Sequence, residues 1–203
     1  MKLFGGVTPA DWLIVGLGNP GSRYEGTPHN VGFEVARALG ERWDLGKPRK
    51  KFNALLTEGR TTPGGPRVAI LLPQTYMNAS GDSVSPARGS LKAPLDRVVV
   101  VHDEIDLPFG EVRVKLGGGV AGHNGLKSLE EGLGSRDFWR VRSGVGRPDS
   151  TDPEIVSAHV LGRFREPRGE VAALIEESAA EAERLVERIA AGEAQPAEKP
   201  GQP

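Results

Sequence analysis

The first candidate for chemistry in this 203-residue chain is His29, which lies in a glycine-rich stretch over residues 15–35. Thr27 and Pro28 stand directly before it, and a hydroxyl residue followed by proline is typical of an N-cap and the first position of a helix. We therefore expect His29 in the first helical turn, where the positive end of the helix dipole disfavours imidazolium. An imidazole that stays neutral near pH 7 can act as a general base. The alternative is a surface histidine at a helix start with no chemical role.

A carboxylate that could orient such a base follows an apolar strand. Asp103 comes directly after the run at residues 98–102, and a carboxylate there is costly unless it is hydrogen-bonded. An aspartate–histidine pair fixes the tautomer of the ring, so that the other nitrogen can take a proton from water. Amide donors for a carbonyl oxygen or an oxyanion are offered by three asparagines in strand-end or glycine-rich loops, Asn19, Asn78 and Asn124. Each of them alone is more typical of a turn or a cap.

Other reaction centres are missing from the sequence. It contains no cysteine, no Gly-x-Ser-x-Gly motif and no His-Glu-x-x-His motif. His102, Asp103 and Asp106 suggest a metal site, but no second histidine stands at ligand spacing, so we expect no metal and no cofactor. What remains is water as the nucleophile, activated by a side-chain base. The residues alone predict a hydrolase or another enzyme that polarises a carbonyl group.

Two glycine motifs are similar to nucleotide-binding loops, and each lacks a required part. Residues 16–21 have the G-x-G-x-x-G spacing of the dinucleotide fingerprint, which needs a helix to open within the glycines. Gly26 and Pro28 delay the helix here, and no strand ends in an acidic residue about 20 positions further on. Segment 117–122 is similar to a phosphate-binding loop, but His123 stands where the lysine is required.

Alternating strands and helices carry these candidates. Strands are expected over residues 12–16, 52–57, 67–72, 97–102, 111–116 and 139–144, and residues 47–51 are interpreted as a basic loop. Helices are expected over residues 29–42, 78–89 and 124–133, from a start at 152–153, and through the apolar positions of 171–189. The alternation predicts an α/β fold, a single domain with a central mixed, largely parallel twisted sheet flanked by helices. Because ligands bind outside the carboxyl ends of such strands, the loops with Asn19, Asn78 and Asp103 should meet in one cleft.

Length and composition narrow the class of protein. The chain suits one domain over residues 11–191, with an N-terminal extension at 1–10 and a disordered tail at 192–203. No apolar run approaches about 18 residues, and residues 1–10 do not resemble a signal peptide, so we expect a cytoplasmic protein without membrane contact. The net charge of −1 argues against general coating of nucleic acid but leaves room for a local basic face.

Four stretches, taken together, resemble the bacterial-type peptidyl-tRNA hydrolases. They are LIVGLGNPGSRYEGTPHNVG (13–32), LLPQTYMNASG (71–81), VVVHDEIDLPFGEVRVKLGGGVAGHNGLKSL (99–129) and RVRSGVGRP (140–148). The resemblance implies a cofactor-free, metal-independent esterase that cleaves peptide from tRNA and so recycles tRNA from prematurely released peptidyl-tRNA. It also implies a monomer without an obligate protein partner. Two departures from the family pattern, Val120 and Ser143, concern loop flexibility and local packing.

The resemblance also assigns roles to individual residues. His29 would activate water, Asp103 would hold His29 in its basic form, and Asn19 would bind the carbonyl near the scissile ester. Substrate contacts are implied for Tyr24, Tyr76, Met77, Asn78 and Asn124, and contacts with tRNA phosphates for Arg113, Lys115 and Arg142. Independently, Arg113 and Lys115 share one face of an expected strand, which suits phosphate binding but also suits a solvated strand face.

Two other functions remain as alternatives. A non-catalytic RNA-binding protein could use the same scaffold, as in plant chloroplast splicing factors that resemble this family. A nucleotide-dependent oxidoreductase is suggested only by the glycine spacing. Retention of His29, Asp103 and the three asparagines favours the enzyme.

Overall fold

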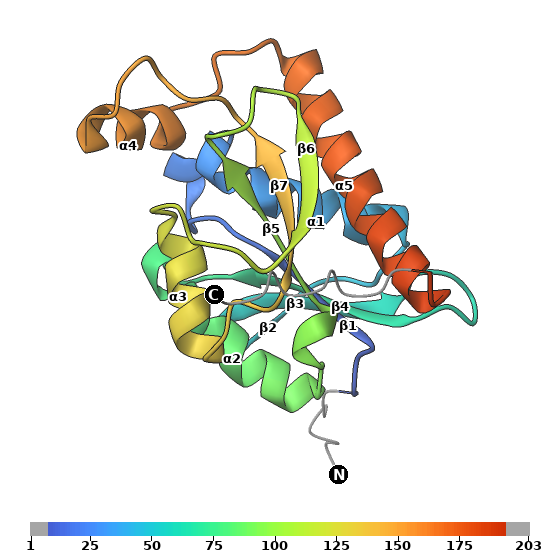
Figure 1. The fold of residues 1–203 in the computed structure, drawn as a ribbon. Coiled ribbons are helices and arrows are strands. Elements are labelled where there is room, and N and C mark those ends of the chain that lie inside the picture. Colours follow the sequence, from blue (N-terminus) through green and yellow to red (C-terminus); the bar gives the residue numbers. More distant parts are fainter. Residues whose placement is uncertain (1–7, 194–203) are drawn as a thin grey trace, which may run out of the picture.

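The computed structural model describes residues 8–193, which fold around one seven-stranded sheet (Figure 1). The strands are β1 (Trp12–Gly16), β2 (Arg49–Lys51), β3 (Ala54–Arg60), β4 (Arg67–Pro73), β5 (Val98–Glu104), β6 (Val112–Leu116) and β7 (Trp139–Gly144). Their order across the sheet is β2-β3-β4-β1-β5-β7-β6. The central strands β4, β1, β5 and β7 run parallel, whereas β2, β3 and β6 pair antiparallel at the two edges. The predicted mixed, largely parallel sheet is confirmed.

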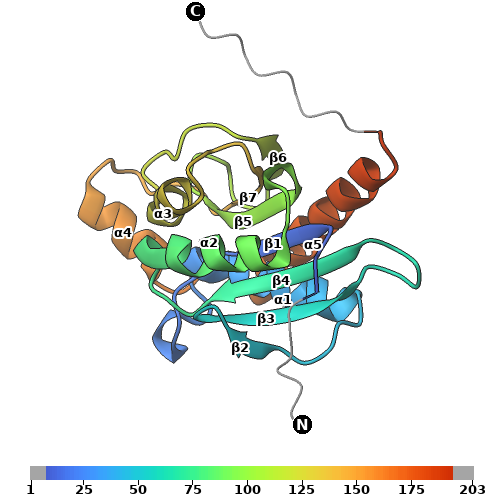
Figure 2. The same cartoon turned by 90° about the horizontal axis from the view of Figure 1, so that it is seen from below.

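Helices cover both faces of this sheet (Figure 2). They are α1 (Val31–Arg42), α2 (Ser80–Leu91), α3 (Asn124–Leu133), α4 (Pro153–Leu161) and α5 (Arg168–Ala190). α1 and α5 pack on one face, and α2 and α3 pack on the other. α4 lies outside both layers and is drawn in orange in Figure 1. None of the helices in the described part combines the length and the apolar character that crossing a bilayer requires.

The apolar run of β5 divides between the two layers. Val99 and Val101 pack in the cluster that holds α1 and α5, and Val98 and Val100 pack in the cluster that holds α2 and α3. Successive side chains of a strand point to opposite faces, so a central strand covered on both sides must be apolar at every position. The same strand places Asp103 at its carboxyl end, where the side chain is still buried.

The edge hairpin differs from the prediction for residues 47–57. Residues 49–51 form the edge strand β2 and not a loop, and β3 begins at Ala54 and not at residue 52. Phe52 and Asn53 form the two-residue turn, with φ of 56° and 51°. A two-residue turn of this type needs positive φ at both positions and is usually signalled by Asn-Gly or Asp-Gly. The sequence lacks that signal, which explains the error.

The predicted N-terminal extension (1–10) and C-terminal tail (192–203) lie largely outside the described residues. The structure does not describe residues 1–7 of the extension or residues 194–203 of the tail. Ala10 is buried, and its N–H donates to the carbonyl oxygen of Leu91 at 3.0 Å. The described end of the extension therefore packs against the end of α2.

Candidate active site

A cavity of about 520 Å³ opens at the carboxyl ends of the central strands. Asn19 follows β1, Met77 and Asn78 follow β4, and Asp103 is the last but one residue of β5. All four residues line the cavity. Residues 120–124 and α4 line it as well. The loops that were expected to meet in one cleft do meet there.

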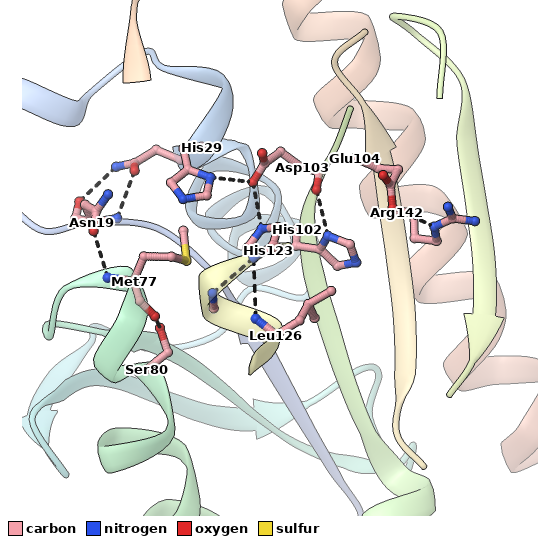
Figure 3. Close-up of polar contacts among 12 residues, drawn as sticks. Asn19, His29, Met77, Ser80, His102, Asp103, Glu104, His123, Leu126 and Arg142 are labelled. Atoms are coloured by element: carbon pink, nitrogen blue, oxygen red, sulfur yellow. Dashed lines mark hydrogen bonds and ion pairs between the residues drawn. The ribbon is translucent and has the colours of Figure 1, made fainter. Parts of the chain in front are cut away.

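Asp103 lies at the centre of the polar contacts (Figure 3). Its side chain is 3% exposed, and its Oδ1 accepts one hydrogen bond from His29 Nδ1 at 2.9 Å and one from His123 Nε2 at 3.0 Å. Burial acts to raise the pKa of the Asp103 carboxyl, but the two histidines beside it outweigh burial and hold that pKa well below its usual range. Asp103 is therefore ionised at neutral pH.

His29 lies in a short 3-10 turn, Pro28–Asn30, and not in the first turn of α1, which begins at Val31. Thr27 occupies the N-cap position and Pro28 the first position of this turn, as predicted, but the Thr27 hydroxyl donates to the carbonyl oxygen of Tyr24 at 2.8 Å and makes no capping hydrogen bond. The orientation of His29 is set by Asp103 instead. Since a carboxylate only accepts, Nδ1 carries the proton of the neutral ring and Nε2 keeps a lone pair.

The pKa of His29 shifts in the direction opposite to the one expected from a helix dipole. Burial lowers the pKa of His29, but the charge of Asp103 and the hydrogen bond to it together raise that pKa above 6.5. The carboxylate thus makes His29 a stronger base and stabilises its imidazolium form.

His123 is a site residue that the sequence indicated only as a misfit in a phosphate loop. It caps α3, where its Nδ1 accepts from the backbone N–H groups of Gly125 (3.1 Å) and Leu126 (3.4 Å). An accepting Nδ1 requires the proton on Nε2, which is the atom that donates to Asp103. A histidine in an N-cap position, where Ser, Thr, Asp or Asn is usual, was the available signal.

His102 contacts this cluster but bonds to the backbone of Asp103 and not to its carboxylate. Its Nδ1 donates to the carbonyl oxygen of Asp103 at 2.7 Å, and its ring stands edge-on to that of His123, with centroids 5.0 Å apart. Burial, with a smaller contribution from His123, lowers the pKa of His102 to about 3, so the ring is neutral. The Asp106 carboxylate binds Arg147 at 2.7 Å, so His102 and Asp106 do not share a ligand position.

His29, Asp103 and His123 also have the spacing of a metal-binding group, with their ligand atoms within 4.8 Å of one another. The hydrogen bonds argue for a different use of these atoms. His123 Nε2 must carry a proton because it donates to Asp103 while Nδ1 accepts from two backbone N–H groups, and a nitrogen that binds a metal must be deprotonated. The arrangement fits a proton-linked cluster.

Asn19 is held so that one group of its amide faces the cavity. Asn30 brackets its backbone, with Oδ1 accepting from Asn19 N–H and Nδ2 donating to the Asn19 carbonyl, both at 2.9 Å. The Asn19 Oδ1 accepts from Met77 N–H at 2.8 Å. This leaves the Nδ2 of Asn19 as the donor for the cavity that the residue lines. Asn30 was not predicted, because helix-start asparagines are common.

The other predicted substrate contacts surround this centre. Tyr76, Met77, Asn78 and Asn124 line the cavity. Tyr24 does not line it, but its ring packs edge-on against the ring of Tyr76, with centroids 6.5 Å apart. Tyr76 is 63% exposed. The two tyrosines form an aromatic rim at the cavity mouth.

The predicted basic residues lie beside the cavity and not in it. Arg113 and Lys115 are exposed on β6, and Arg113 stands opposite Arg142 of β7 in the sheet register. Arg142 Nε binds the Glu104 carboxylate at 3.0 Å, and Arg113 pairs with Glu111. All three cations share one face of the sheet edge.

Comparison with known proteins agrees with this site. The model of the family described as peptidyl-tRNA hydrolase matches residues 13–199. The peptidyl-tRNA hydrolase of Syntrophotalea carbinolica is 49% identical over 152 residues, which is 75% of this chain and 78% of that protein. That of Afipia carboxidovorans is 49% identical over 175 residues, covering 86% and 85%. The crystal structure of the Acinetobacter baumannii enzyme superposes with a TM-score of 0.78 at 37% identity, covering 93% and 92%. The chain belongs to the peptidyl-tRNA hydrolase family, and the predicted activity, hydrolysis of peptidyl-tRNA, is thereby supported.

Proposed function

We propose that His29 is the general base of this hydrolase and that Asp103 and His123 hold it in its reactive form. The observation that carries the proposal is the pair of hydrogen bonds on one carboxylate oxygen, of which only one partner leaves a ring nitrogen for the cavity. A solvated histidine has no reason to be held in this way.

In the proposed reaction, His29 Nε2 takes a proton from a water molecule as the water oxygen attacks the ester carbonyl carbon. The bond from that carbon to the terminal ribose oxygen then breaks, and the imidazolium returns the proton to the departing oxygen. The products are a peptide carboxylic acid and tRNA with a free hydroxyl. The Asp103 carboxylate stabilises the imidazolium between these steps, which is the role of a triad aspartate.

Asn19 supplies the electrostatic part of the proposal. Its Oδ1 is engaged by Met77 N–H, so its Nδ2 is directed to the developing oxyanion or to the neighbouring peptide carbonyl. A fixed amide donor adds no charge to the ground state and costs no reorganisation during the reaction. Asn78 and Asn124 are proposed as further donors along the wall of the cavity, which Met77 also lines.

The tRNA part of the substrate is proposed to extend from the cavity over the edge formed by β6 and β7. Arg113, Lys115 and Arg142 lie on that edge. The aromatic rim of Tyr24 and Tyr76 suits stacking by the terminal bases. We further propose that the enzyme acts as a monomer in the cytoplasm and needs no protein partner.

The test is the release of peptide from a purified N-acetylaminoacyl-tRNA. The wild-type chain should hydrolyse it, and His29→Ala should not, while both should retain the same tRNA in a filter-binding assay to within a few-fold. Retained hydrolysis by His29→Ala would remove this histidine as the base. A chain that binds tRNA but releases no peptide in any form would identify the non-catalytic alternative.

A further inference from the structure

Arg140 is a buried cation whose use is not explained by the site described above. It lies on β7 and is 3% exposed. Its two terminal nitrogens donate to the carbonyl oxygens of Gly119 (2.6 Å) and Gly118 (2.7 Å), and the guanidinium lies over the ring of Phe138. Its Nε is buried without a hydrogen-bond partner in the described structure. A buried guanidinium is costly unless it is well compensated, so its place requires a reason.

The surroundings add to that cost. Burial and the charges of Arg136 and Arg142 lower the pKa of Arg140, and the smaller opposing effects of the Glu104 and Glu130 carboxylates do not offset them. The charged donors of Arg140 thus bind two neutral carbonyl groups of a single loop. An arginine retained for sheet stability alone would not need to reach that loop.

The loop in question, residues 117–122, has a backbone that regular structure does not fix. Gly117, Gly118, Ala121 and Gly122 have φ between 45° and 103°. At its start Gly117 N–H donates to the Phe138 carbonyl at 3.0 Å, and at its end His123 N–H donates to the Val120 carbonyl at 2.8 Å. Between these points the two bonds from Arg140 tie the loop to the sheet.

This loop leads directly into His123, which bonds to the Asp103 carboxylate. Val120 and Ala121 line the cavity, and His123 donates to Asp103 at 3.0 Å. The position of the loop therefore determines both one wall of the cleft and the reach of His123 to the carboxylate.

We propose that Arg140 is a positioning residue for hydrolysis, which acts by holding the carbonyl groups of residues 118 and 119 so that the loop presents His123 to Asp103. It does not touch the substrate. The inference rests on the proposed roles of His29 and Asp103. A direct contact with a tRNA phosphate is the competing use, but both terminal nitrogens are already bonded and the side chain is covered.

The test compares Arg140→Met, Arg140→Lys and a matched control, Arg136→Gln. Arg136 is an exposed neighbour that pairs with Glu130 and whose side chain does not bond to the loop. With a minimal peptidyl-adenosine substrate, Arg140→Met should lower kcat by up to about 10-fold, the scale typical for loss of an outer hydrogen-bond partner. Arg140→Lys keeps one charged donor and should lose less, and Arg136→Gln should stay within about two-fold of wild type.

Two further measurements separate positioning from the other readings. In protein labelled with ¹⁵N-histidine, the Nε2 proton of His123 should broaden or vanish in Arg140→Met and persist in Arg136→Gln, a result that needs no catalysis and so stands apart from the base assignment. Gly119 has open space around an added Cβ and no positive φ, so Gly119→Ala should stiffen the loop and partly restore kcat in Arg140→Lys. If Arg140→Met does not fold, the comparison of Arg140→Lys with and without Gly119→Ala tests the proposal instead.

The proposal is overturned by a loss confined to KM for full-length tRNA, which would make Arg140 a phosphate-binding residue. It is equally overturned if kcat and the His123 proton signal are unchanged in a folded Arg140→Met or Arg140→Lys protein.

Discussion

Two segments, from different parts of the chain, each bring one histidine to the same carboxylate oxygen. The turn Pro28–Asn30 places His29 Nδ1 at 2.9 Å from Asp103 Oδ1, and the start of α3 places His123 Nε2 at 3.0 Å from it. The two rings differ in what their remaining nitrogen does. His123 uses it to accept two backbone N–H groups, whereas His29 presents it at the cavity. In the proposed mechanism, the backbone around each ring, and not the residue type, therefore makes His29 the base and His123 its support.

The largest expected effect comes from removing the His29 ring, whose Nε2 is free to accept a proton. His29→Ala should lower kcat by about 10³-fold, within the range for loss of a general base, while peptidyl-tRNA binding changes by only a few-fold. His159→Asn is the matched control, because His159 Nε2 donates to backbone carbonyls and an amide can still do so. Single-turnover hydrolysis measures both. Comparable rates for the two variants would end the assignment of His29.

The next largest effect is expected from removing the charge of Asp103, to which both histidines bond. Asp103→Asn is expected to lower kcat by about 10²–10³-fold with little change in KM, less than the roughly 10⁴ known for a serine-protease triad. Asp103 raises the pKa of His29, and His29 must be unprotonated to act. Loss of the Asp103 charge therefore lowers the pKa of His29, and the acidic limb of kcat against pH should move to lower pH. A limb that stays in place would leave Asp103 as a structural carboxylate.

Removing the supporting ring should have a smaller effect and move the pH profile in the opposite direction. His123→Asn keeps a good N-cap for α3, but its side chain is too short to serve Asp103 in the same way. With one donor lost, the Asp103 charge acts more strongly on His29, so the pKa of His29 should rise and the acidic limb should move to higher pH.

We expect kcat of His123→Asn to fall about 10-fold at pH 7, because outer hydrogen-bond partners typically contribute on that scale. His123→Ala additionally loses the cap, and chemical denaturation should show about 1 kcal/mol less stability than His123→Asn. A shift of the limb to lower pH in either variant would contradict this account of the two histidines.

The smallest effects are expected outside the histidine cluster. Arg113→Ala and Lys115→Ala should raise KM for full-length tRNA and reduce the slope of binding against salt by about one each. Hydrolysis of peptidyl-adenosine should hardly change, because neither residue lines the cavity. Equal losses on both substrates would assign these residues to the fold.

Much of this arrangement could be read from the sequence because periodicity and strand ends are local signals. The apolar run of β5 predicted both a central strand and the placement of Asp103 at its carboxyl end. The convergence of Asn19, Asn78 and Asp103 followed from the parallel topology. Motif resemblance then supplied roles that no periodicity could.

The features that the sequence did not predict depend on contacts between distant segments. His123 is 20 residues from Asp103 and Asn30 binds Asn19 across 11 residues, so neither bond has a local signature. Ser143, noted as a departure at a buried position, pairs its hydroxyl with that of Ser178 in α5 at 2.7 Å. The hydrogen bond with Ser178 satisfies the buried hydroxyl of Ser143, and the two residues come close only in the folded chain.

The most direct test of the central claim is the tautomer of each histidine ring, read from long-range ¹H–¹⁵N correlation spectra of ¹⁵N-histidine-labelled protein. The chain has four histidines, so single substitutions suffice to assign them. Above the raised pKa of His29, the account predicts the proton on Nδ1 in His29 and on Nε2 in His123. A proton on Nε2 of His29 would leave no lone pair to accept a proton from water, and would contradict its assignment as the base.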